Sequence, residues 1–175
     1  GLRLVAGAEV NIKDFDGGLD LDRDVLRQLD FVVASYHVEA IDPAASEQHT
    51  RGWLNVIANP DVDCLGHCGN PVFACDYEAV VKACREHKKA VEINSSSFKV
   101  RPGSAETCRT VALLCKEYGV PVLISSDAHS RYLVGDHQAA IRLLESVGFP
   151  EELVINGEKG RLMNYLDWLE QGKAL

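Results

Sequence analysis

The chain has 175 residues and carries 18 basic against 26 acidic side chains, which gives a formal net charge of −8. Apolar residues make up 46% and charged residues 25%, an ordinary balance for a globular protein. No apolar run approaches the roughly 20 residues of a membrane span, so we expect no membrane association. Nucleic-acid binding is also disfavoured, because an extended binding surface needs a row of basic side chains that displaces counterions from phosphates.

Six cysteines occur without a Cys-x-x-Cys pair, and a chain of this length does not need disulfides to fold. We therefore expect reduced thiols and a cytoplasmic location. No linker or low-complexity stretch divides the sequence, which predicts a single domain over residues 1–175. The chain begins with Gly1 rather than Met, directly before an apolar run, and this leaves open whether it is part of something longer.

Short apolar runs alternate with amphipathic segments along the whole sequence. The runs are rich in Val and Ile and nearly continuous, which is typical of strands covered on both faces in a parallel sheet. Such alternation predicts βαβ units and an α/β fold. Ser104 is the expected N-cap of the second predicted helix, and Gly119 is expected to end it. The predicted strands span residues 2–10, 30–35, 62–66, 90–93 and 120–125, and the predicted helices 76–87, 108–118, 138–147 and 162–170.

Ionisable residues stand at or near the end of each apolar run. Together with Glu92 inside the fourth run, they follow one another at intervals of 25 to 35 residues, about the length of one βαβ unit. Because parallel strands deliver their C-terminal ends to one rim, these side chains are expected to meet there. The candidate metal ligands are Glu9, His37, His67, Asp127 and His129.

Each of these residues also has a structural interpretation. A single His at a strand end is commonly a satisfied structural residue, and a single Asp there is commonly a cap or turn former. Gathering five such groups without a partner would be costly, whereas one or more cations would satisfy them all. Carboxylate oxygen and neutral imidazole nitrogen are ligands for zinc, manganese or iron. On the residues alone, both interpretations stay open.

Spacing refines the ligand set. Asp127 and His129 are two residues apart, so on an extended strand they would point to the same face. Cys64 and Cys68 lie at odd separations from His67, which predicts that their sulfurs face away from it. His49 and His87 lie in charged surroundings and are expected to be solvated, and His137 is expected near a helix start.

The segment after the fourth run is a second candidate region. Glu92 itself is expected inside the strand and is left out of the ligand set. The hydroxyls, amide, cation and helix N-terminus that follow could bind a phosphate, and a capped polar loop explains them equally well. The candidate substrate-binding residues are Asn94, Ser96 and Arg101.

Taken together, these residues resemble the polymerase-and-histidinol-phosphatase (PHP) superfamily, and within it the stand-alone bacterial phosphatases of the YcdX type. The likeness covers nearly the whole chain. The stretches that carry it are residues 7–12 (GAEVNI), 34–37 (ASYH), 66–71 (GHCGNP), 92–98 (EINSSSF) and 125–129 (SSDAH).

The resemblance implies a distorted seven-stranded, TIM-like β/α barrel with up to three metal ions at the strand ends. It implies that Glu9 bridges two ions, that His37 and His67 join it on one of them, and that Asp127 holds the other. His129 would belong to a third ion. The implied reaction is hydrolysis of a small phosphomonoester by a metal-activated water.

The sequence departs from the family pattern in two ways. Cys68 stands where such proteins usually have Pro. The initial strand that ends in His-x-His is absent, so the resemblance implies an incomplete barrel that lacks the first two βα units and has impaired activity. The resulting open strand edge would be covered by a segment from elsewhere or by a second copy in a homo-oligomer.

Two other functions stay open. One is the PHP-type nuclease module of a DNA polymerase, which would need basic surface or a fused polymerase. The other is a metal-stabilised fragment without catalysis, whose interactions rather than chemistry would matter.

Overall fold

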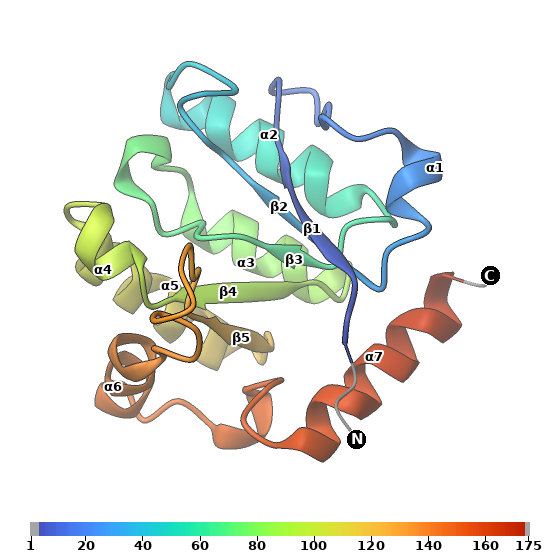
Figure 1. Cartoon of the computed structure of the whole chain (residues 1–175). Coiled ribbons are helices and arrows are strands. Elements are labelled where there is room, and N and C mark those ends of the chain that lie inside the picture. The colour runs from blue at the N-terminus through green and yellow to red at the C-terminus, as the bar shows by residue number, and fades with distance from the viewer. Residues whose placement is uncertain (1–3, 174–175) are drawn as a thin grey trace.

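The computed structural model of the chain describes residues 4–173. Five parallel strands form one sheet in which each strand lies beside its neighbour in the sequence (Figure 1). The predicted α/β fold is confirmed, and each apolar run holds one strand. The strands are β1 (Gly7–Asn11), β2 (Phe31–Ser35), β3 (Cys64–Leu65), β4 (Ala90–Asn94) and β5 (Val122–Ser125).

The first strand begins later than predicted. Leu2 and Arg3, in the predicted run, lie outside the described residues, and Leu4 is 82% exposed. β1 begins at Gly7, opposite Phe31, where β2 begins. Because residues 4–6 have no described strand beside them to pair with, the apolar run alone overestimates the length of the strand.

Helices cover one face of the sheet. Their apolar sides pack on the buried alternate residues of the strands, such as Val32, Leu65 and Val91, to form the main core. The four predicted helices are confirmed. The sequence pattern does not predict the helix over Ser46–Ala58 (α2), because polar residues and a glycine interrupt its apolar side. Figure 1 shows α2 (Ser46–Ala58), α3 (Tyr77–Glu86) and α5 (Ser104–Tyr118) behind the sheet. Farther along the chain lie α6 (Gln138–Ser146) and α7 (Lys159–Lys173). The two short helices, α1 (Arg23–Leu26) and α4 (Ser97–Val100), are single turns.

Of the two predicted ends of α5, the C-terminal one is confirmed and the N-terminal one is wrong. Gly119 adopts the left-handed conformation with φ 65° and ends the helix, as predicted. The prediction that Ser104 is the N-cap is wrong. Gly103, with φ 86°, takes that position, and Ser104 is the first residue of the helix with its hydroxyl buried and without a hydrogen-bond partner.

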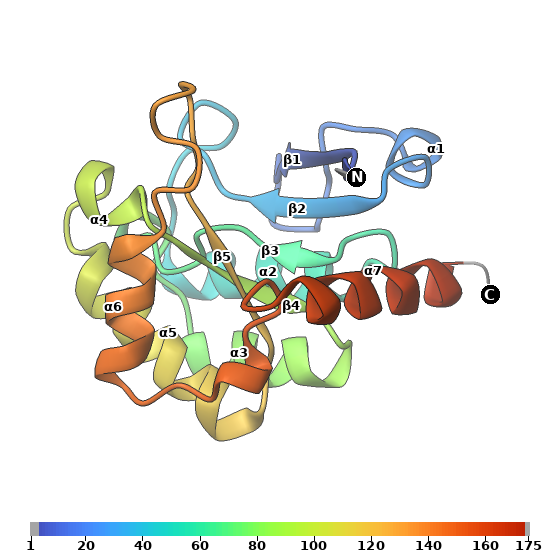
Figure 2. The same ribbon diagram turned by 60° about the horizontal axis from the view of Figure 1, so that its bottom comes forward.

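The other face of the sheet is divided between apolar and polar halves. Toward the N-terminal ends of the strands, Cys64 and Ala90 form a second, smaller core with Ile155, and Leu162 and Tyr165 of α7 pack against it. Figure 2 shows α7 lying along this side. Toward the C-terminal ends the same face is polar: it carries Glu9, Ser35, Glu92, Asn94 and Ser125.

The two outer strands differ at their free edges. Beyond β5, the amide of Asn156 donates to the carbonyl of Ile124 and accepts from its N–H, which satisfies that edge without a further strand. β1 pairs only with β2 among the described strands; on its other edge Asp20 bonds to the N–H and the carbonyl of Asn11, and the part of that edge before Asn11 is open. All six cysteines are free and buried, and no described helix is long and apolar enough to cross a membrane.

A buried carboxylate connects α1 to the loop that precedes β3. Asp61 accepts hydrogen bonds from Nε of Arg23 at 2.7 Å and Nε of Arg27 at 3.2 Å. Burial raises the pKa of Asp61, but the two guanidinium groups outweigh burial and bring its pKa below the ordinary value. The resulting stabilisation is present above the pKa of the unfolded chain and is lost as pH falls through the lower folded pKa.

We therefore expect Asp61→Asn to reduce the free energy of unfolding at pH 7 by about 1 kcal/mol. The difference from the wild type should shrink as the pH falls below about 4, because the wild-type carboxylate then protonates too. Urea unfolding at a series of pH values measures both effects. Asp42→Asn, at an exposed carboxylate, is the control. An effect of Asp61→Asn that does not change with pH would contradict this account.

Candidate metal centre

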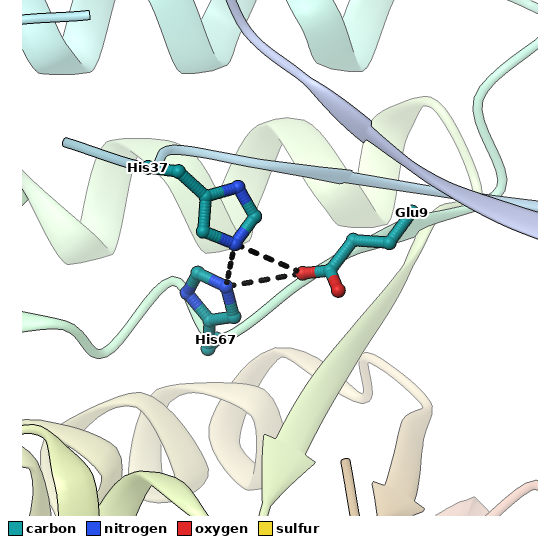
Figure 3. A group of neighbouring side chains, drawn as sticks. All are labelled: Glu9, His37 and His67. Carbon is teal, nitrogen blue, oxygen red and sulfur yellow. Dashed lines mark hydrogen bonds and ion pairs between the residues drawn. The ribbon is translucent and has the colours of Figure 1, made fainter. Parts of the chain in front are cut away.

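Three side chains from three successive strands converge at the C-terminal rim of the sheet (Figure 3). Glu9 lies on β1, and His37 and His67 each lie two residues beyond the end of a strand. Glu9 Oε1 is 3.1 Å from Nε2 of His67 and 3.5 Å from Nε2 of His37, and the two imidazole nitrogens are 3.0 Å apart. One donor atom from each residue lies within 4.8 Å of the others, so the group can hold a cation.

Parallel pairing explains why these residues meet. Glu9 stands opposite Val33 in the register of β1 and β2, and therefore on the face that α2, α3 and α5 leave uncovered. Gly66 makes room for the convergence. A Cβ at this glycine would collide with Ser35 Oγ and lie 2.8 Å from Val33 Cγ1.

The tautomer of His37 is fixed by its neighbour. Asn11 holds its side-chain oxygen 2.8 Å from His37 Nδ1, while its amide nitrogen donates to Asp20. The proton of His37 therefore lies on Nδ1, and Nε2 presents a lone pair toward Glu9 and His67. Burial, with the neighbouring His67, lowers the pKa of His37, which favours the neutral ring that a metal requires.

Glu9 is held as a carboxylate. The hydrogen bond with His67 lowers its pKa most, burial opposes this, and the Ser35 hydroxyl, which donates to Oε1 at 2.6 Å, lowers it further. The net result is a pKa of about 2. The group therefore offers one negative charge near neutral pH, together with two imidazole nitrogens.

The donor set fits a divalent cation. Two nitrogens bound to one zinc ion at about 2.0–2.1 Å in tetrahedral geometry lie roughly 3.4 Å apart. The observed separations of 3.0, 3.1 and 3.5 Å are close to this value. Nitrogen and carboxylate oxygen are also suitable ligands for manganese or iron, so the geometry does not choose among the metals.

His67 has a strained backbone and a buried acidic neighbour. Its φ is 29°, in the left-handed region that residues other than glycine rarely adopt. Its backbone N–H donates to Oε2 of Glu92 at 2.7 Å. Burial raises the pKa of Glu92, whose other oxygen accepts from the hydroxyl of Ser125. Glu92 is thus in contact with a candidate ligand without joining the three converging donors.

Asp127 and His129 lie outside this group of three. The prediction that they share one face of an extended strand is wrong, because β5 ends at Ser125 and Asp127 has a φ of 48°. The ring of His129 bends back, with Nδ1 3.0 Å from the carbonyl oxygen of Asp127, and its side chain is 85% exposed. The strand ends before these residues, so the period of two no longer applies.

Two of the three candidate substrate-binding residues, Asn94 and Arg101, lie beside Asp127. Asn94 donates from its amide to Asp127 Oδ2 at 3.1 Å and accepts from the N–H of Ser97. Arg101 is mostly buried, 3.8 Å from the same Asp127 oxygen, and donates to Ser97 Oγ. Ser96 directly precedes α4 and makes no side-chain capping bond. The loop therefore brings a guanidinium group beside the carboxylate of Asp127.

The remaining histidines give one correction. The prediction that His49 is solvated is wrong: it is 2% exposed, and it packs against the rings of Tyr36 and Phe73. Its Nε2 accepts from the N–H of Ala44, and its Nδ1 donates to a backbone carbonyl, which makes it a neutral core residue. His87 is exposed as predicted, and His137 precedes α6.

Several known proteins are similar to this chain in sequence. It is 43% identical over 166 residues to a probable phosphatase of Acetivibrio thermocellus, covering 95% of this chain and 69% of the relative. It is also 43% identical to a probable phosphatase of Caldicellulosiruptor saccharolyticus, covering 97% and 70%. The chain belongs to this family of probable phosphatases. No protein-family model matches it.

Two solved structures share the fold of this phosphatase-family chain. One is a chain of archaeal ribonuclease P in complex with mature tRNA, with a TM-score of 0.60 and 18% identity, covering 98% of this chain and 71% of the other. The second is the histidinol phosphate phosphatase of Lactococcus lactis with zinc, L-histidinol and phosphate. Its TM-score is 0.54 at 18% identity, covering 74% and 64%. At these identities the likeness establishes the fold alone.

Gly66 offers a direct test of the convergence. We expect Gly66→Ala to weaken zinc binding by about tenfold or more, because its Cβ displaces Ser35 and with it the carboxylate of Glu9. Competition with a chromogenic chelator measures the affinity. Gly160→Ala is the matched control, since a Cβ there meets nothing within 4 Å. Equal affinities for the wild type and Gly66→Ala would mean that the packing around Glu9 does not shape the site.

Proposed function

We propose that this protein is a metal-dependent phosphoesterase of the PHP superfamily that hydrolyses a small phosphomonoester. The observation that carries the proposal is the convergence of Glu9, His37 and His67 on one point at the rim. It is supported by relatives that are 43% identical and named probable phosphatases. The zinc, L-histidinol and phosphate in the Lactococcus lactis structure agree with it.

In this proposal Glu9, His37 and His67 hold one divalent ion of zinc, manganese or iron. Asp127 and His129 serve further ions, up to three in all. The chemistry that such cations supply is Lewis acidity, which makes water more acidic and offsets the charge of a phosphoryl group. Glu9 contributes the anionic donor, and Asn11 orients the ring of His37.

Arg101 is proposed to bind a phosphoryl oxygen of the substrate. Its guanidinium is fixed by Ser97 and lies near Asp127, on the side of the site opposite Glu9 in the order of the strands. A planar guanidinium suits phosphate because it can donate two parallel hydrogen bonds. Asn94 holds Asp127, and Ser96 adds a hydroxyl from the same loop.

The five strands are proposed to be part of a distorted seven-stranded β/α barrel. This chain spans about 70% of the length of the relatives it matches, so their additional length can supply further strands. We propose that the open edge of β1 is covered in the assembled protein, either by such a segment or by a second copy. The net charge of −8 favours a small anionic substrate held at metal ions over a polynucleotide, and so disfavours the nuclease alternative.

His67→Ala is the most direct test of this function. We expect it to reduce bound zinc or manganese at least tenfold and to abolish metal-stimulated release of phosphate from p-nitrophenyl phosphate, since it removes the most buried donor. Metal analysis after gel filtration and the phosphate assay measure the two effects.

His87→Ala is the control, because His87 is exposed and lies outside the group of three. It should match the wild type in both assays. Equal losses in the two variants would mean that the site is misplaced. A wild-type chain that binds metal but releases no phosphate would favour the non-catalytic alternative, and trimming of DNA would favour the nuclease.

A further inference from the structure

Glu92 lies in the middle of the sheet with both carboxylate oxygens in use. It is on β4, which is buried along its whole length. Oε2 accepts the backbone N–H of His67 at 2.7 Å, and Oε1 accepts the hydroxyl of Ser125 at 2.6 Å. The side chain therefore connects the ends of β3 and β5 across the strand between them.

The contact with His67 replaces a regular ladder bond. β3 has only two residues, and its register with β4 pairs Leu65 with Val91. If that register continued, the N–H of His67 would point to the main-chain carbonyl of Glu92. The carboxylate accepts this N–H instead, at the point where the backbone turns into the left-handed region with φ 29°. Such a conformation costs roughly 1–2 kcal/mol, so it persists only when its surroundings hold it.

The turn at His67 directs its ring toward Glu9 and His37. Its Nε2 lies 3.1 Å from Glu9 Oε1 and 3.0 Å from Nε2 of His37, and its side chain is 2% exposed. With β3 ended at Leu65, Glu92 supplies the hydrogen bond that fixes the backbone from which this ring projects.

We infer that Glu92 is a positioning residue for the metal centre, which it orients by accepting the backbone N–H of His67 from inside the sheet. This inference rests on the proposed function. According to this inference, the metal centre depends on the length of the Glu92 side chain rather than on its charge.

Two substitutions separate reach from charge. Glu92→Asp keeps the charge but is one methylene too short to reach His67, whereas Glu92→Gln keeps the length and can still accept the N–H while its amide donates to Ser125. We expect Glu92→Asp to weaken Co²⁺ and Zn²⁺ binding about 10- to 100-fold and Glu92→Gln to stay within about threefold of the wild type. The visible absorption per bound Co²⁺ should change in Glu92→Asp alone, because it reports the ligand geometry.

Asp63 provides a matched control on the neighbouring strand connection. It is also a buried carboxylate that accepts a backbone N–H, that of Val32, but at the opposite end of the strands. Asp63→Ala should lower the free energy of unfolding and leave the Co²⁺ affinity and spectrum of the folded protein unchanged.

The outcomes distinguish this inference from the proposed function. If the wild-type chain binds neither Co²⁺ nor Zn²⁺, the proposed metal centre itself fails. If the wild type binds but Glu92→Asp binds equally well with the same spectrum, the positioning role is overturned and the metal centre stands. Equal weakening by Glu92→Gln and Glu92→Asp would also overturn it, because charge would then matter as much as reach.

Discussion

Two imidazole nitrogens and a carboxylate oxygen face one another within about one hydrogen-bond length, and the surrounding structure holds them there. A hydrogen bond from His67 to Glu9 satisfies one of these contacts, and the lone pairs that remain gain little from such closeness. Each of the three residues is held in place by a hydrogen bond with a neighbouring residue outside the group. Asn11 bonds to His37, Ser35 bonds to Glu9, and Glu92 holds the backbone of His67. A cation at the centre would turn this arrangement of acceptors into a satisfied site.

This constraint explains why the uncovered face of the sheet is divided. Its N-terminal half is apolar and lies under α7, which gives the strands a second core. Its C-terminal half carries two acid–hydroxyl pairs, Glu9 with Ser35 and Glu92 with Ser125. The apolar half stabilises the strands, and the polar half can then collect buried charge at their ends. A histidinol phosphate phosphatase and a ribonuclease P chain both share the fold of this chain. The fold alone therefore does not determine the function.

The sequence predicts the frame of the site better than its details. Short apolar runs mark all five strands, and the spacing of Glu9, His37 and His67 matches two βαβ steps because the parallel topology is regular. Where the structure departs from this regular pattern, the sequence no longer predicts the position of a side chain. β5 ends before Asp127, so its period of two does not reach His129, and the interrupted apolar side of α2 hides the fact that His49 is a core residue. Gly66 and Glu92 begin two of the stretches that carry the family resemblance, but their roles depend on contacts between strands that only the folded chain brings together.

Six buried thiols in the same chain make the identity of the ligand atoms the central question. X-ray absorption at the zinc edge of the zinc-loaded protein answers it directly. We predict a first shell of nitrogen and oxygen at about 2.0–2.1 Å with the outer-shell scattering of two imidazole rings. A sulfur shell at about 2.3 Å, or the absence of imidazole scattering, would contradict the assignment of the site to Glu9, His37 and His67.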